Sequence, residues 1–101
     1  MITYNEIIDF IFKSIDEINL QNDTNISKDE NTKLFGRESE LDSLSLVNLI
    51  IDLETTLSND YELDISLTDD RAMMREVSPF DSIKSLAEYI EELVSESYVG
   101  S

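Results

Sequence analysis

The stretch ELDSLSLVNLIIDLETTL, residues 40–57, decides the fold. Asp42 and Ser43 are residue types that commonly begin helices, and the apolar residues after them recur at helical spacing. The pattern predicts a helix from Asp42 or Ser43 to about Leu57. One apolar stripe of this helix consists of Leu46, Leu49, Ile50, Leu53 and Leu57, and a separate apolar flank consists of Leu44, Val47 and Ile51. A helix with so much apolar surface either lies centrally in a bundle or carries a docking face.

Two further amphipathic helices are predicted on either side of this stretch. The first runs from about residue 3 to about residue 20 on an apolar stripe formed by Tyr4, Ile7, Ile8, Ile11, Ile15 and Ile18. The last begins near Ser82 on a stripe formed by Ile83, Leu86, Ala87, Ile90, Leu93 and Val94. Residues 96–101 are expected to be a frayed tail.

The two connecting regions are expected to be irregular. Residues 21–31 are polar, and Leu34 and Phe35 are expected to pin the end of that loop to the core. In residues 58–78, apolar residues alternate at Leu63, Ile65 and Leu67, but a strand without a partner would be unstable. We therefore expect an extended connector, followed by a short helix through Ala72, Met73 and Met74.

These elements predict an all-α fold, a small bundle of three main helices and one short helix. Residues 1–95 would form one domain. The predicted core consists of Ile7, Ile11, Ile15, Leu46, Ile50, Leu53, Ile83, Leu86 and Ile90.

The composition narrows the possible partners. The chain has 101 residues, with 7 Lys plus Arg against 23 Asp plus Glu and a formal charge of −16. Such a charge repels nucleic-acid backbones, and it either attracts proteins with basic patches or only keeps a small domain soluble. No apolar run is long enough to span a membrane, and Asn5, Glu6 and Asp9 interrupt any secretion signal. We expect a cytoplasmic monomer without membrane insertion or nucleic-acid binding.

The residue inventory argues against an enzyme. The chain has no His and no Cys, which excludes His-based triads, thiolate chemistry and the usual zinc sites. Only two glycines are present, and no Gly-rich phosphate loop is found. We expect no catalytic residue and no metal site.

The segment Asp42-Ser43-Leu44, at the start of an aliphatic second helix that follows a first helix and a long loop, resembles the marker of the acyl carrier protein family. The resemblance covers about residues 3 to 95. It implies that Ser43 is esterified to 4′-phosphopantetheine, taken from coenzyme A by a magnesium-dependent phosphopantetheinyl transferase that recognises Asp42. A serine at a helix start also places the phosphate near unpaired N–H groups.

The resemblance also implies a function and a docking surface. The arm would hold acyl intermediates as thioesters for fatty-acid or polyketide synthesis, and acyl-loading and acyl-transferring enzymes would dock through basic patches. The docking residues would be Leu44, Val47, Asn48, Ile51, Asp52 and Glu54. A peptidyl or aminoacyl carrier remains an alternative, as does an unmodified acidic helical adaptor in which Asp42 is simply a helix cap.

Two features qualify the resemblance. Asp81-Ser82-Ile83 repeats the pattern, but it follows a short approach restricted by Pro79, and Ser82 is interpreted as the N-cap of the last helix. In addition, Leu41, Ser45, Asn48 and Thr55 differ from the residues usual in housekeeping carriers. These differences suggest a specialised carrier.

Overall fold

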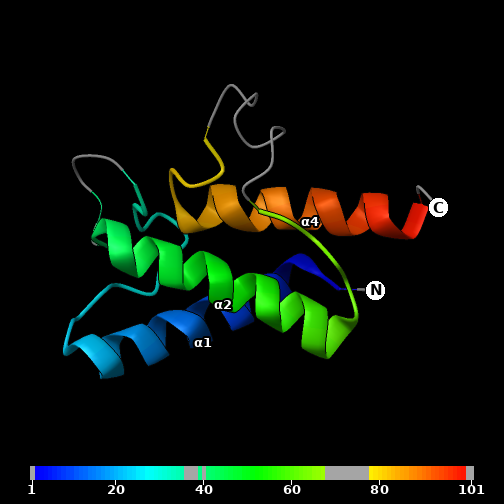
Figure 1. Ribbon diagram of the computed structural model, residues 1–101. Helices are drawn as coiled ribbons and strands as arrows, with labels where there is room; N and C mark the ends of the chain where they lie inside the picture. Colours follow the sequence, from blue (N-terminus) through cyan, green and yellow to red (C-terminus); the bar gives the residue numbers. More distant parts are fainter. Residues whose placement is uncertain (1, 36–38, 40, 68–77, 100–101) are drawn as a thin grey trace.

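The computed structural model describes residues 2–35, 39, 41–67 and 78–99. Over these residues the chain forms the helices α1 (Tyr4–Asn22), α2 (Ser43–Tyr61) and α4 (Ile83–Val99) (Figure 1). No strand occurs in the described ranges, where the isolated antiparallel bridge between Lys33 and Ser82 is the sheet-like contact. The predicted all-α class is confirmed for this part of the chain, whereas the predicted short helix lies outside it. None of the described helices combines the length and the apolar character that crossing a membrane requires.

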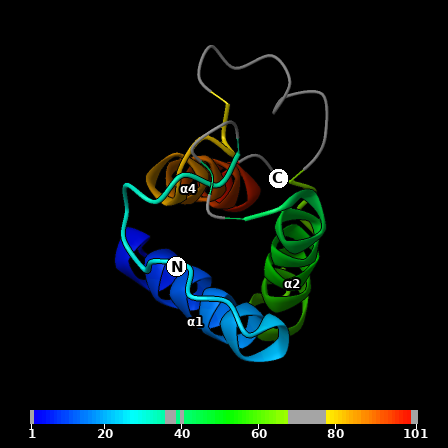
Figure 2. The same cartoon turned by 90° about the vertical axis from the view of Figure 1, so that its left-hand side faces the viewer.

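The helix α1 packs against both α2 and α4 (Figure 2). It runs antiparallel to α2, because contacts join opposite ends of the two helices. At one end the Asn22 amide donates to the Ser45 hydroxyl over 3.4 Å. At the other end the rings of Phe10 and Tyr61 lie 6.1 Å apart between centroids. The part of α1 from Phe10 to Asn22 therefore lies beside α2.

The helices extend beyond the predicted ends. The helix α2 continues from Leu57 to Tyr61, and α4 continues to Val99, into the segment expected to be frayed. The predicted ends were too early because they relied on apolar spacing, which stops at Leu57 in α2 and at Val94 in α4. Glu62 ends α2 in the left-handed region at φ 57, with its N–H donating to the Leu57 carbonyl.

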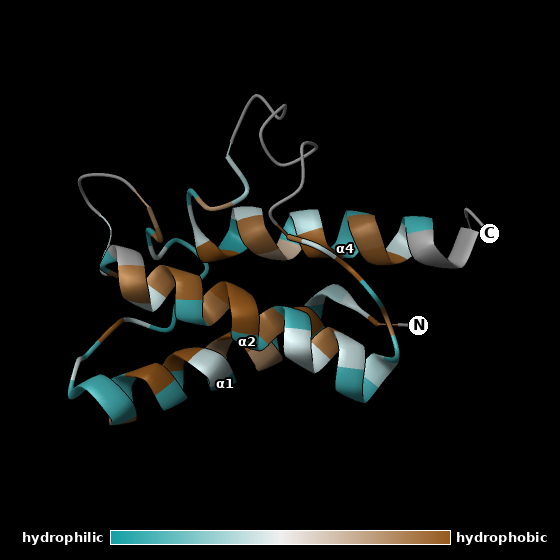
Figure 3. Cartoon of the chain, in the orientation of Figure 1, coloured by the Kyte–Doolittle hydropathy of each residue, from teal (hydrophilic) through white to brown (hydrophobic). Residues whose placement is uncertain are grey.

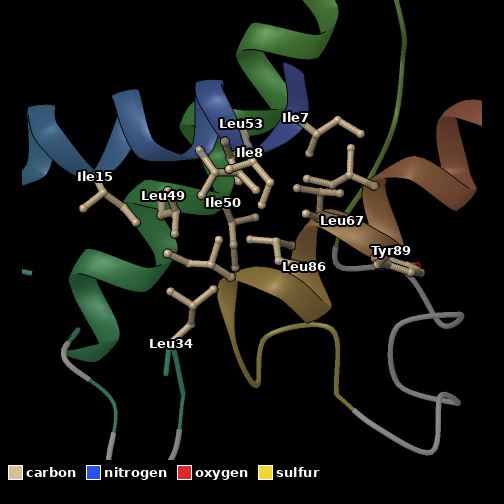
Figure 4. Packing of buried hydrophobic residues seen from close by; sticks show 14 of the residues in the cluster. Ile7, Ile8, Ile15, Leu34, Leu49, Ile50, Leu53, Leu67, Leu86 and Tyr89 are labelled. Atoms are coloured by element: carbon tan, nitrogen blue, oxygen red, sulfur yellow. The ribbon is translucent and has the colours of Figure 1, made fainter. Parts of the chain in front are cut away.

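The apolar stripes of the three helices meet in one core, and Figure 4 shows their side chains pointing toward one another. All nine predicted core residues are buried. Leu34 and Leu67 complete the core from the loops, and Leu63 and Ile65 pack against it, so the expected inward-pointing side chains are found at these three alternating positions of the connector. The expectation for Phe35 was wrong, since 64% of it is exposed, and Leu34 alone of this pair is buried.

Candidate functional site

The start of α2 has the geometry of a well-capped helix. Asp42 is the N-cap in an extended conformation, and its Oδ1 accepts a hydrogen bond from the Ser45 N–H at 2.7 Å. The Asp42 carbonyl accepts from the Leu46 N–H at 3.0 Å. Ser43 is therefore the first helical residue, at the positive end of the helix dipole.

Hydrogen bonds at this cap also change the pKa of the Asp42 carboxyl. Hydrogen bonding from Ser45, first through its backbone N–H and then through its side chain, lowers the pKa of Asp42 below its ordinary value. A depressed pKa means that the ionised carboxylate is favoured in the folded protein. Asp42 therefore contributes stability above its ordinary pKa of 3.8 and loses that contribution as the pH falls through the lower, folded value.

We expect Asp42→Asn to show this dependence directly. Asparagine still caps a helix but does not titrate, so only the charge-dependent part of the stability is removed. At pH 7 the variant should be less stable than the natural protein, and the difference should shrink as the pH falls below 3.8. Urea unfolding of both proteins at stepwise lower pH measures the difference. A gap that stays constant from neutral to strongly acidic pH would contradict the expectation.

An exposed apolar face begins beside Ser43. Leu44 is 71% exposed, Val47 49% and Ile51 55%, and Asn48 is also exposed. At about 100° per residue these side chains fall on one side of α2, opposite its buried stripe. The apolar colouring of α2 is concentrated in its N-terminal half (Figure 3). The structure thus brings four of the predicted docking residues together on one outward face.

The two predicted acidic docking residues lie on opposite edges of this face. Asp52 is half-buried on the edge toward α1 and lines the clefts between the helices. Glu54 is half-buried on the other edge, and its Oε2 accepts from the Leu67 N–H at 2.7 Å. Glu54 therefore holds the connector after α2 in place with one oxygen.

The departures from the family's usual residues divide into two kinds. Leu41 and Ser45 are each only 5% exposed. Their identity therefore follows from packing, and a partner protein cannot reach them. Asn48 and Thr55 are exposed. These two are the departures that can alter the surface seen by a partner.

In the second Asp-Ser-aliphatic segment, Asp81-Ser82-Ile83, the helix begins one residue later than in the first. Ser82, not the aspartate before it, is the residue that caps α4, because the Ser82 Oγ accepts from the Ser85 N–H at 3.2 Å. Its carbonyl accepts from the Leu86 N–H, and the residue is only 8% exposed. The interpretation of Ser82 as an N-cap is confirmed.

The first N–H groups of α4 are also occupied by the polar loop. The Ile83 N–H donates to the Thr32 carbonyl at 3.1 Å, and the Lys84 N–H donates to the Glu30 carbonyl at 2.9 Å. At the start of α4, little N–H capacity is therefore left for an added anionic group. At α2, in contrast, the Leu44 N–H has no acceptor within the described residues.

Sequence reasoning missed the surface between α1 and α2. The structure places Phe10 of α1 against Tyr61 of α2 and surrounds both with carboxylates. The signal was present as the spaced acidic residues Glu6, Asp9 and Glu17 along one side of α1. The helix that packs beside these residues cannot be predicted from one segment alone.

The described residues contain no cluster of three or more carboxylates suited to a metal ion. Comparisons of the chain with protein-family models, with curated proteins and with solved structures give no match.

Proposed function

We propose that this chain is an acyl carrier protein whose Ser43 carries a 4′-phosphopantetheine arm. The observation that carries the proposal is the difference between the two Asp-Ser-aliphatic segments. Ser82 is buried and caps α4, so its oxygen has a structural role. Ser43 lies one position further into its helix, because Asp42 is the residue that caps α2. The cap of α2 is therefore formed by Asp42 and not by the serine that follows it, whereas at α4 the serine itself is the cap.

The proposed modification is a simple phosphoryl transfer. The Ser43 oxygen forms a bond to the phosphorus next to the pantetheine of coenzyme A. The bond from that phosphorus to the remaining 3′,5′-adenosine bisphosphate breaks, and the serine proton passes to a base of the transferase. The resulting phosphodiester is anionic and would lie at the start of α2, where the helix dipole favours negative charge.

The outward face of α2 supplies the proposed docking surface. Leu44, Val47 and Ile51 are large apolar side chains left exposed beside the arm, a feature typical of a surface that a partner covers. The chain's charge of −16 attracts partner enzymes with basic patches over long range. Asn48 and Thr55 keep the centre of the face neutral, which supports a specialised carrier with its own set of enzymes.

Intact-mass measurement tests the proposal. The protein is incubated with coenzyme A, magnesium and a transferase of broad specificity, and the mass should rise by one phosphopantetheine. A control carrier in the same mixture reports that the transferase is active. If the control is modified and this chain is not, the proposal fails and the unmodified acidic adaptor becomes the better description.

A modified protein does not by itself identify the cargo. Loading the arm with acyl groups or with amino acids, each by its own class of loading enzyme, separates an acyl carrier from an aminoacyl carrier. Formation of an acyl thioester, removable by neutral hydroxylamine, is the result expected here.

A further inference from the structure

The last turn of α1 is fixed to the loop that follows it. The side chain of Asn19 accepts from the Ile26 N–H at 2.9 Å and donates to the Ile26 carbonyl over 3.2 Å. Ile26 itself is buried in the core. The Asn19 carbonyl also accepts from the N–H of Asp23, which ends α1 in the left-handed region at φ 54. The end of α1 therefore has a defined position in the fold.

The end of α1 lies next to the start of α2 (Figure 1). Asn22 is the last residue of α1, and its Nδ2 donates to the Ser45 Oγ over 3.4 Å. Ser45 belongs to the first turn of α2 and is only 5% exposed. A buried hydroxyl needs hydrogen-bond partners, and Asn22 supplies a donor to its oxygen.

Ser45 is also hydrogen-bonded to Asp42, through its backbone and through its side chain. The Ser45 N–H donates to the Asp42 Oδ1 at 2.7 Å, and the Ser45 side chain is hydrogen-bonded to the same carboxyl. An ionised carboxylate only accepts hydrogen bonds, so the Ser45 hydroxyl donates its hydrogen to Asp42 while its oxygen accepts from Asn22. This hydroxyl therefore connects the end of α1 to the carboxylate that caps α2.

The orientation of the Asp42 carboxylate bears on the attachment reaction. Asp42 is exposed and directly precedes Ser43, so an enzyme that reaches Ser43 also meets this carboxylate. Two hydrogen bonds from Ser45 hold it before the enzyme arrives. A group that is already ordered does not lose conformational freedom on binding, and the enzyme therefore binds more favourably.

We propose that Asn22 and Ser45 are positioning residues for phosphopantetheine attachment, because they hold the Asp42 carboxylate in one orientation beside Ser43. Asn22 acts through the Ser45 hydroxyl, and Ser45 acts through Asp42. Ser45 is too buried to meet the transferase itself. The inference rests on the proposed function, since it concerns attachment to the same serine.

One variant changes the direction of the Ser45 hydrogen without removing the contact between the helices. Asn22→Asp keeps the shape of the side chain but replaces the donor by a carboxylate oxygen, which draws the Ser45 hydrogen away from Asp42. With the unmodified chain as the varied substrate, the kcat/KM of the transferase should fall about fivefold, the effect of losing one hydrogen bond. A contact that only joins α1 to α2 would survive this change, and kcat/KM would then stay the same.

Gln21→Glu is the matched control for the added charge. It makes the same change from amide to carboxylate at the neighbouring exposed residue and keeps the Asn22 donor. It should change kcat/KM less than about twofold, because water and salt screen an exposed charge. Circular dichroism establishes that each variant is folded.

Ser45→Ala tests whether both residues act through one hydroxyl. The variant keeps the N–H that donates to Asp42, so the cap of α2 remains, but kcat/KM should again fall about fivefold. Combined with Asn22→Asp, it should still give about fivefold and not about twenty-fivefold, because the second change has no hydroxyl left to act on.

An NMR titration of the Asp42 carboxyl supplies a readout that needs no transferase. In Ser45→Ala the pKa of Asp42 should rise toward its ordinary value of 3.8, since one of the hydrogen bonds that lower it is gone. The inference is overturned if this pKa does not change, if Gln21→Glu lowers kcat/KM as much as Asn22→Asp, or if the two losses multiply. A natural protein that is not modified at all would instead overturn the proposed function, and the role in attachment with it.

Discussion

Ser43→Ala should remove phosphopantetheine attachment completely, leaving a mass that does not change when the transferase and coenzyme A are added. The physical reason is that alanine has no oxygen to bond to phosphorus. Alanine is a good residue for a first helical turn, and the cap formed by Asp42 does not involve the replaced hydroxyl. The variant should therefore fold as the natural protein does, with the same circular dichroism spectrum.

Ser82→Ala is the matched control, because it changes the same residue type in the second copy of the pattern. It should be modified as fully as the natural protein. It should also lose about 1 kcal/mol of unfolding free energy, the usual cost of removing a serine N-cap, since the Ser85 N–H loses its acceptor. If Ser82→Ala abolished modification and Ser43→Ala did not, the assignment to Ser43 would be wrong and the modified residue would be Ser82.

Leu53→Ala should produce a large loss of stability, about 2–5 kcal/mol of unfolding free energy. Leu53 has no exposed surface, and it lies in the core where side chains of α1, α2 and α4 converge (Figure 4). Truncation removes three carbons from a closely packed interior and leaves a cavity. For a domain of 101 residues such a loss is a large part of the total stability, and the urea midpoint should fall sharply.

Ile51→Ala provides the comparison on the same helix, two residues earlier. Ile51 is 55% exposed, so the truncation should cost about 0.5 kcal/mol or less. Under the proposed function the same change should weaken docking of partner enzymes. Equal destabilisation by the two variants would contradict the placement of Leu53 in the core and of Ile51 on the outward face of α2.

The fold could largely be predicted because the buried and the exposed apolar residues of α2 lie on different sides of the helix axis. Leu46, Leu49 and Leu53 recur on one side and are buried, whereas Leu44 and Ile51 fall on the other and are exposed. A periodic pattern carries that information directly. The ends of α2 and α4 were missed because the regular apolar spacing stops at Leu57 and Val94, whereas the helices continue to Tyr61 and Val99.

The candidate site was harder to predict because it depends on register and on contacts between helices. Asp42 and Asp81 precede serines in the same local pattern, yet only Asp42 is the cap of its helix. The difference arises where the polar loop meets α4, through contacts that no local pattern reports. Phe35 was misassigned for a related reason, since an apolar residue next to a buried one can still point outward.

The polar loop's attachment to the start of α4 also bears on when the molecule can fold. Lys33 and Asp81 form an ion pair at 3.2 Å although they are 48 residues apart in the chain. The carbonyls of Glu30 and Thr32 likewise find their donors only in the first turn of α4. During synthesis on the ribosome, α1, the loop and α2 therefore emerge before the helix that closes their core. Folding of the domain must wait for that last helix, because non-local contacts form only once both partners are present.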